Sequence, residues 1–125
     1  MNALLTYRRL TEADIPTFVA MRIAQLKEEG AKSDLDIEPA LTAYYQKHLA
    51  DGTFVSWLAV DGENIIGTSG MSFVEKPPYY SNPTGKIGLL SSMYTNPTYR
   101  RQGIARKLLD HVVEEARTYL SLIHI

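Results

Sequence analysis

The sequence predicts an α+β fold in which helices pack on a mixed β-sheet, with elements in the order β-α-α-β-β-β-α. Two observations indicate this. Apolar residues recur at helical spacing near both ends of the chain and at the two-residue spacing of strands in the middle. Of the 125 residues, 45% are hydrophobic and 22% are charged, which suits one domain with an ordinary core. We therefore expect a single domain over residues 1–125.

The N-terminal part is expected to form one strand and two helices. Residues 4–10 have the composition of a short strand, and Thr11 with Asp14 resembles a capping pair at the start of a helix. The apolar stripe of this first helix ends at Gly30, and that of the second ends at Gly52. Glycine is the residue that most readily closes a helix, which supports both boundaries.

The middle of the chain is expected to form a hairpin. Residues 54–60 and 65–74 are rich in β-branched and aromatic residues and flank a short polar turn. Gly67 and Gly70 weaken the second of these strands and indicate a bulge or a close backbone approach. Trp57, in the first strand, is expected to lie in the core.

The C-terminal part is expected to add an irregular loop, a strand and an amphipathic helix. Residues 75–86 contain three prolines and a glycine, which excludes regular structure, and residues 87–95 form the next strand. His111 falls on the polar face of the last helix, where we expect it to be solvated. The apolar face of that helix comprises Ile104, Leu108, Leu109, Val112, Ala116 and Tyr119.

Composition excludes several classes of function. The formal net charge is -1, so nothing indicates a nucleic-acid partner or an anionic membrane surface. The absence of cysteine excludes disulfides and thiolate chemistry, and the three scattered histidines show no metal-ligand spacing, so we expect no metal. No apolar run approaches the roughly 20 residues of a membrane span. The N-terminus lacks a signal peptide, and we expect a cytoplasmic protein.

The segment from Arg100 to Ala105 has the features of an anion site. It lies between a strand and a helix, and the free N–H groups and dipole of a helix N-terminus favour negative charge. Two arginines beside the turn add donors suited to phosphate. The spacing matches neither the P-loop nor the dinucleotide fingerprint. The sequence therefore predicts a phosphorylated ligand without identifying it.

Arg100-x-x-Gly103-x-Ala105 resembles the R/Q-x-x-G-x-G/A signature of the GNAT N-acetyltransferase superfamily. The similarity extends along residues 93–109 and through the order of elements from residue 4 to about residue 119. It implies the acyl-CoA N-acyltransferase fold of that family, with acetyl-CoA as co-substrate and its pyrophosphate on the backbone N–H groups of the turn. The cofactor-binding residues that it implies are Met93, Tyr94, Thr95, Arg100, Arg101, Gln102, Gly103, Ile104, Ala105 and Arg106.

The resemblance also implies the chemistry. A backbone N–H of Met93 or Tyr94 would polarise the thioester carbonyl, a contribution worth about 3–4 kcal/mol where one such donor has been removed elsewhere. A lysine-like amine of pKa about 10.4 is neutral in about one molecule in 2,500 at pH 7, so forming the nucleophile costs about 4.6 kcal/mol. A general base or a water chain is therefore expected. The base remains open among Glu28, Glu29 and Glu75.

The implied function is that of an acyltransferase of the EC 2.3.1 class, in which a primary amine of a small molecule or protein attacks acetyl-CoA directly. Glu28, Tyr79 and Tyr80 are the candidate substrate residues. The alternative is a non-catalytic acyl-CoA-binding or sensing domain of the same fold. A homodimer is left open.

The family domain normally continues beyond this helix with a strand, another helix and two further strands. We therefore expect the domain to be incomplete at its C-terminus and to have little activity. The last six residues, 120–125, match the translation of a common sequencing-adapter end, which suggests that they are not native.

Overall fold

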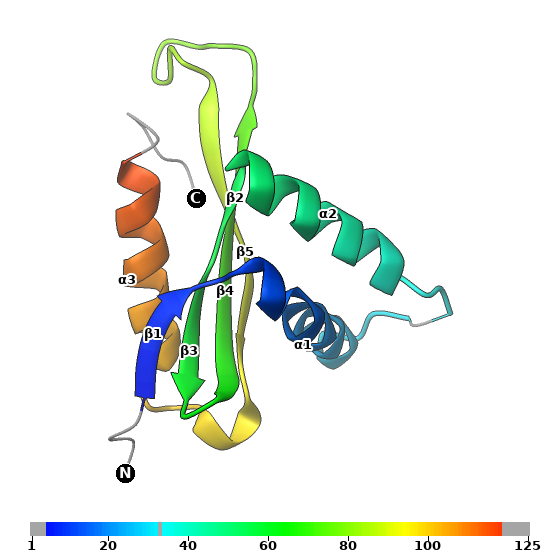
Figure 1. Ribbon diagram of the computed structural model, residues 1–125. Coiled ribbons are helices and arrows are strands. Elements are labelled where there is room, and N and C mark those ends of the chain that lie inside the picture. The colour runs from blue at the N-terminus through cyan, green and yellow to red at the C-terminus, as the bar shows by residue number, and fades with distance from the viewer. Residues whose placement is uncertain (1–4, 33, 119–125) are drawn as a thin grey trace.

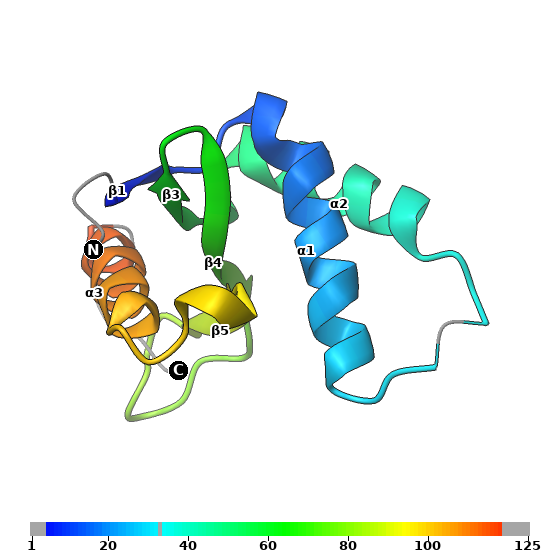
Figure 2. The ribbon, with the colours of Figure 1, turned by 90° about the horizontal axis from the view of Figure 1, so that it is seen from below.

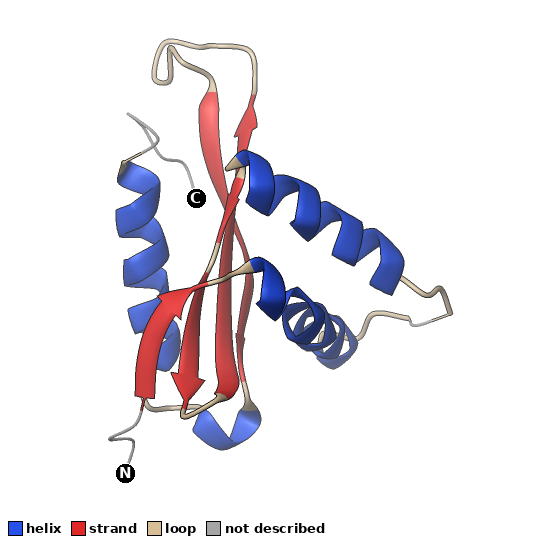
Figure 3. Ribbon diagram, viewed as in Figure 1, coloured by secondary structure: helices blue, strands red, loops and turns tan. Residues whose placement is uncertain are grey.

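A computed structural model describes residues 5–32 and 34–118 of the chain. It confirms the predicted α+β class and order of elements, with the strand expected at 54–60 divided at Ser56 (Figures 1 and 3). The elements are β1 (Leu5–Arg9), η1 (Glu12–Asp14), α1 (Ile15–Glu28), α2 (Glu38–Asp51), β2 (Phe54–Val55), β3 (Trp57–Asp61), β4 (Asn64–Glu75), β5 (Lys86–Thr95), η2 (Pro97–Tyr99) and α3 (Ile104–Arg117).

The sheet is built around the long strand β4. β2 and β3 pair with one edge of β4, β5 pairs with its other edge, and β1 pairs with β3. All of these pairs are antiparallel. Among the residues that the structure describes, β5 has no second strand beside it, so its outer edge is open.

The helices form two layers, one on each face of the sheet. Figure 2 shows α3 on one side of the strands and α1 with α2 on the other. Side chains alternate between the two faces along a strand. In β3, accordingly, Leu58 and Val60 join the cluster under α1 and α2, while Ala59 packs with Ile104 and Leu108 of α3.

The entry into α1 confirms the predicted capping pair. The Asp14 carboxylate accepts hydrogen bonds from the main-chain N–H and the hydroxyl of Thr11, both at 2.8 Å. The Arg8 guanidinium of β1 donates to the same carboxylate at 2.7 and 2.9 Å. These donors favour the ionised form and lower the pKa of Asp14 well below its ordinary value.

β4, the second strand of the predicted hairpin, lies close to neighbouring main-chain and side-chain atoms at Gly67 and Gly70. A Cβ built on Gly70 would lie 2.8 Å from Cζ of Phe54 and 3.1 Å from the Ser91 carbonyl oxygen. The register between β3 and β4 shifts where Ala59 faces Gly67 and Val60 faces Ile65. Both findings agree with the close approach and bulge predicted there.

α3 follows the predicted apolar face, with three differences, and the first is that Leu109 is only half-buried and lies on the outer surface beside Arg106 and Asp110. Ile104, Leu108, Val112 and Ala116 are buried, but Glu115 is buried with them because its carboxylate binds the indole N–H of Trp57 at 2.7 Å and the Arg9 guanidinium at 3.0 Å. Prediction of His111 as solvated surface was wrong. Its ring is half-buried and stacks on half-buried Trp57, with ring centroids 4.4 Å apart.

Two remaining expectations concern the ends of the chain and the membrane. Tyr119 and the segment 120–125 lie outside the described residues. Within residues 5–32 and 34–118, no helix is both long enough and apolar enough to cross a bilayer.

Candidate active site

The turn between β5 and α3 has an unusual backbone. Arg101 and Gly103 both adopt positive φ, at 66° and 80°. Gly103 is the N-cap of α3 and supplies no side-chain cap, and the helical hydrogen bonding begins with the Lys107 N–H donating to the Gly103 carbonyl at 3.2 Å. The N–H groups of residues 104–106 therefore precede the first helical bond and are available to an anion.

Space is also available at this turn. A Cβ built on Gly103 would meet no atom of the protein within 4 Å, and the side chains of Arg101, Gln102, Ala105 and Arg106 are exposed. Ile104 is buried, so only its main chain can face a ligand. The structure thus places the predicted turn residues around one exposed helix N-terminus.

Arg100 is directed away from that N-terminus by its partners. Its guanidinium donates to the Thr95 carbonyl at 2.8 Å and forms an ion pair with Glu28 at 2.8 Å. It also lies 5.4 Å from the centroid of the Tyr94 ring. The structure therefore brings together three predicted cofactor residues and the predicted substrate residue Glu28, and fixes the end of α1 to the end of β5.

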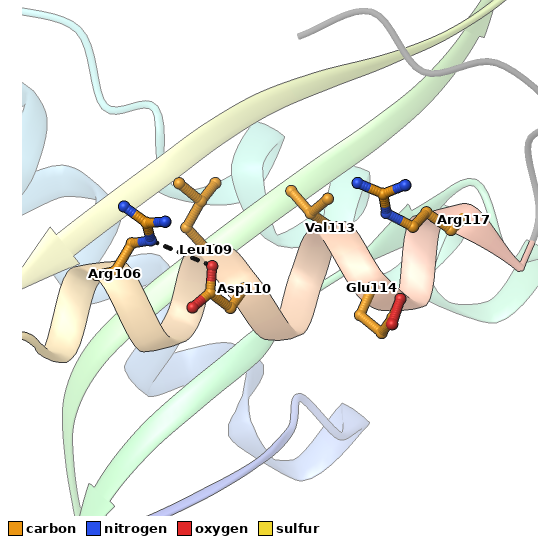
Figure 4. A pocket seen from close by; sticks show the side chains of 6 residues that line it. All are labelled: Arg106, Leu109, Asp110, Val113, Glu114 and Arg117. Atoms are coloured by element: carbon orange, nitrogen blue, oxygen red, sulfur yellow. Dashed lines mark hydrogen bonds and ion pairs between the residues drawn. The ribbon is translucent and has the colours of Figure 1, made fainter.

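Arg106 contributes to the outer surface of α3. Figure 4 shows its guanidinium directed toward the Asp110 carboxylate, at an N–O distance of 3.2 Å. Both side chains are exposed, so this i,i+4 pair is weak and leaves the arginine able to reach an anion at the helix N-terminus. The hollow on this surface, which Leu109 and Val113 also line, has a volume of about 460 Å³.

β5 is interrupted by a bulge just before the turn. Gly70 faces Ser91 and Thr68 faces Tyr94, so Ser92 and Met93 together oppose the single residue Ser69. Ser92 is buried and has φ of 57°, which a non-glycine residue adopts only where its surroundings hold it there. The sequence did not indicate this bulge, because no glycine marks it.

Side chains of other elements hold the bulge in place. The Thr68 hydroxyl donates to the Ser92 carbonyl at 2.7 Å, and the Gln25 side-chain amide donates to the Met93 carbonyl at 3.0 Å. The hydroxyl of buried Tyr45 lies 3.4 Å from the Ser92 hydroxyl. These contacts take up the main-chain carbonyls of the two residues that lack regular partners in β4.

Gln25 is also hydrogen-bonded to Arg22. Its amide oxygen accepts a hydrogen bond from Arg22 at 2.9 Å, and Gln25 itself is 8% exposed. Burial raises the pKa of the Tyr45 hydroxyl, and the nearby charge of Arg22 opposes that rise. Sequence reasoning missed both residues. A signal existed, because they follow Ile15 and Phe18 by seven residues and so fall on the buried stripe of α1.

The loop with Tyr79 and Tyr80 lies at the other end of the sheet from the turn (Figure 1). These side chains are 44% and 107% exposed. Met93 follows Lys86, where β5 begins, by seven positions, which is about 23 Å of extended strand. The structure therefore does not bring Tyr79 and Tyr80 to the bulge.

Of the three candidate bases, only Glu28 is joined to the site. Glu75 faces Lys86 at the far end of β4 and β5, and Glu29 is exposed beyond the end of α1. Hydrogen bonding and charge from Arg100 lower the pKa of Glu28. Among the described residues, no group of three or more histidines, aspartates and glutamates is arranged to hold a metal ion.

Comparison with known proteins gave concordant results. The model of the family described as Acetyltransferase (GNAT) family matches residues 18–125. The crystal structure of a predicted acetyltransferase with acetyl-CoA from Clostridium acetobutylicum is 38% identical over 96% of this chain and 79% of that one, with a TM-score of 0.91. No curated protein matched the chain.

Two more distant structures share the fold. A GCN5-related N-acetyltransferase from Ralstonia eutropha is 24% identical, with a TM-score of 0.84 over 97% of this chain and 83% of that one. An aminoglycoside acetyltransferase from an uncultured soil metagenomic sample, in complex with sisomicin, is 20% identical, with a TM-score of 0.66 over 93% and 72% of the two chains.

Proposed function

The chain belongs to the acetyltransferase (GNAT) family, and on that premise we propose that it transfers an acetyl group from acetyl-CoA to a primary amine of a small molecule or a protein. The observation that carries this proposal is the left-handed Gly103 at the start of α3, the next α-helix after the strand with the open edge. The similar protein from Clostridium acetobutylicum was crystallised with acetyl-CoA, which supports the choice of co-substrate.

The pyrophosphate would bind at the start of α3. The N–H groups of residues 104–106 and the helix dipole favour its negative charge, and Arg101 and Arg106 are near enough in sequence to add to it. Arg100 has a different role here. Its bonds to Glu28 and to the Thr95 carbonyl orient the turn.

The pantetheine arm would then run along the open edge of β5, pairing with the main chain from Met93 to Thr95. The bulge positions the reacting carbonyl. The side-chain bonds to the carbonyls of Ser92 and Met93 fix the main chain of the bulge, and the Met93 or Tyr94 N–H would donate to the thioester oxygen. Charge develops on that oxygen as the amine attacks, so a fixed donor stabilises the transition state.

The chemical step is a direct transfer. The amine nitrogen forms a bond to the acetyl carbon, the carbon–sulfur bond breaks, and the CoA thiolate takes up a proton while the nitrogen loses one. Glu28 is a poor base because Arg100 lowers its pKa. We propose that water carries the amine proton to solvent.

Calorimetric titration with acetyl-CoA and with CoA, followed by thiol release in the presence of an amine panel, tests this function. Binding of both nucleotides with thiol release for at least one amine supports the enzyme. Binding with no thiol release supports a non-catalytic acyl-CoA-binding domain, and an inactive fragment of the enzyme would give the same result. Absence of binding overturns both.

A further inference from the structure

Arg22 is held beside the bulge by a relay of hydrogen bonds. The Arg22 guanidinium donates to the Gln25 amide oxygen at 2.9 Å, and the Gln25 amide nitrogen donates to the Met93 carbonyl at 3.0 Å. Arg22 is half-buried and Gln25 is buried. A positive charge therefore lies close to the main chain that would hold the thioester.

This charge has no counter-charge within the part of the chain that the structure describes. No aspartate or glutamate there lies within 4.0 Å of Arg22, whereas Arg100 and Arg106 each have a carboxylate partner. A guanidinium has five N–H donors; one binds Gln25, and the guanidinium also interacts with the Tyr45 hydroxyl, which leaves further donors for an anion. Partial burial of an unpaired guanidinium costs free energy, and binding of an anion to the guanidinium offsets that cost.

The proposed reaction needs no such charge. A cation beside the acceptor site repels the ammonium form of an amine, so Arg22 works against a polycationic acceptor. It favours an acceptor that carries its own anion a short distance from the amine. A single planar guanidinium suits a single planar carboxylate, which it can bind through two parallel hydrogen bonds.

We propose that Arg22 binds the carboxylate of the acceptor, so that the preferred acceptors are primary amines bearing a carboxylate, as amino acids do. This inference rests on the proposed acetyl transfer and names its substrate class. Gln25 is then a positioning residue, because it fixes Arg22 relative to the Met93 main chain without touching the substrate.

The kinetic test compares amino acids with their own carboxamides. The ratio of kcat/KM for acid and amide is measured for wild type, Arg22→Gln and Arg22→Lys, and comparing ratios between proteins cancels the different basicity of the two amines. We expect Arg22→Gln to lower kcat/KM for the acids by about 10- to 150-fold, as for loss of a charged hydrogen bond, and to leave the amides nearly unchanged. Arg22→Lys should recover part of the loss. An equal loss for acids and amides overturns the proposal.

A binding test separates this proposal from the proposed function. Wild-type protein is titrated with N-acetylalanine and with its amide, and the arginine Nε–Hε signals are followed by NMR. The Arg22 signal is the one missing in Arg22→Lys. It should shift with the acid alone. A shift without any acetyl transfer would leave the carboxylate site standing and overturn the enzyme. Acetyl transfer with no shift of the Arg22 signal, or with the same shift for the amide, would overturn the carboxylate site and leave the enzyme standing. Acetyl-CoA affinity and circular dichroism of each variant report whether it is folded.

Discussion

Gly103 and Gly52 offer a matched pair of substitutions that separates ligand binding from stability. Each ends or begins a 14-residue helix, each has φ of 80°, and a Cβ on either would meet no protein atom within 4 Å. They differ in one respect. Gly103 lies at the start of α3, where the pyrophosphate would bind, and Gly52 closes α2 elsewhere.

The loss of stability should be the same for Gly103→Ala and Gly52→Ala. A left-handed alanine costs about 1–2 kcal/mol, and the lower entropy of the unfolded alanine chain returns about 0.4–1 kcal/mol. The net loss is about 1 kcal/mol. At about 2.1 cal/mol/K per residue, a chain of this length has an unfolding entropy near 260 cal/mol/K, so both variants should melt about 4 °C below wild type.

The two variants should differ in their affinity for acetyl-CoA. The Gly103→Ala methyl group projects into the space beside the free N–H groups and removes at least one charged hydrogen bond, which is about 1.5–3 kcal/mol, or about 10- to 150-fold in Kd. Gly52→Ala should bind as wild type does. Calorimetric titration gives Kd and differential scanning fluorimetry gives the melting temperature. If Gly103→Ala binds acetyl-CoA as tightly as Gly52→Ala, the pyrophosphate does not lie at this helix N-terminus.

Three further predictions concern stability. Glu115→Ala should lower the free energy of unfolding by about 2 kcal/mol in urea titrations because the indole N–H of Trp57 loses its buried acceptor, whereas Glu115→Gln keeps an acceptor and should cost less than half as much. The folded-state pKa of Asp14 is below its unfolded value of about 3.9, so the stabilisation by Arg8 is present above that pH and lost as the pH falls further. Asp14→Asn should therefore be less stable than wild type at pH 7 and lose less stability on acidification, and parallel curves for the two proteins would contradict this. Gly70→Ala should cost about 1–3 kcal/mol by overpacking a phenyl ring, and an unchanged urea midpoint would show that the ring moves aside freely.

Local sequence was sufficient for most of the fold. Apolar spacing and terminal residues located the three α-helices and the long strands, because burial of one face and the helix boundaries at Gly52 and Gly103 depend on nearby residues. The exceptions involve partners far away in the sequence. Glu115 lies on a buried face because it contacts a tryptophan and an arginine of two strands, and the stacked ring of His111 depends on the same tryptophan.

The candidate site divides in the same way. The turn at Arg100–Ala105 was visible because its chemistry is contiguous in the chain. The bulge at Ser92 could not be found from local sequence, since its left-handed serine is held by residues of α2 and β4. Arg22 and Gln25 gave a weaker signal, as polar residues on an apolar stripe, and only the fold shows that they reach β5.

The amide of Gln25 links the two proposed substrate sites without touching either substrate, because it bonds to Arg22 on one side and to the Met93 carbonyl on the other. An acceptor that shifts the position of the Arg22 guanidinium would also shift the β5 main chain on which the thioester lies. A bound thioester would likewise shift the position of the guanidinium. Thermodynamic linkage makes such coupling reciprocal, so each substrate changes the dissociation constant of the other by the same factor. Loss of this one amide, as in Gln25→Leu, should make the two binding events independent even where both substrates still bind.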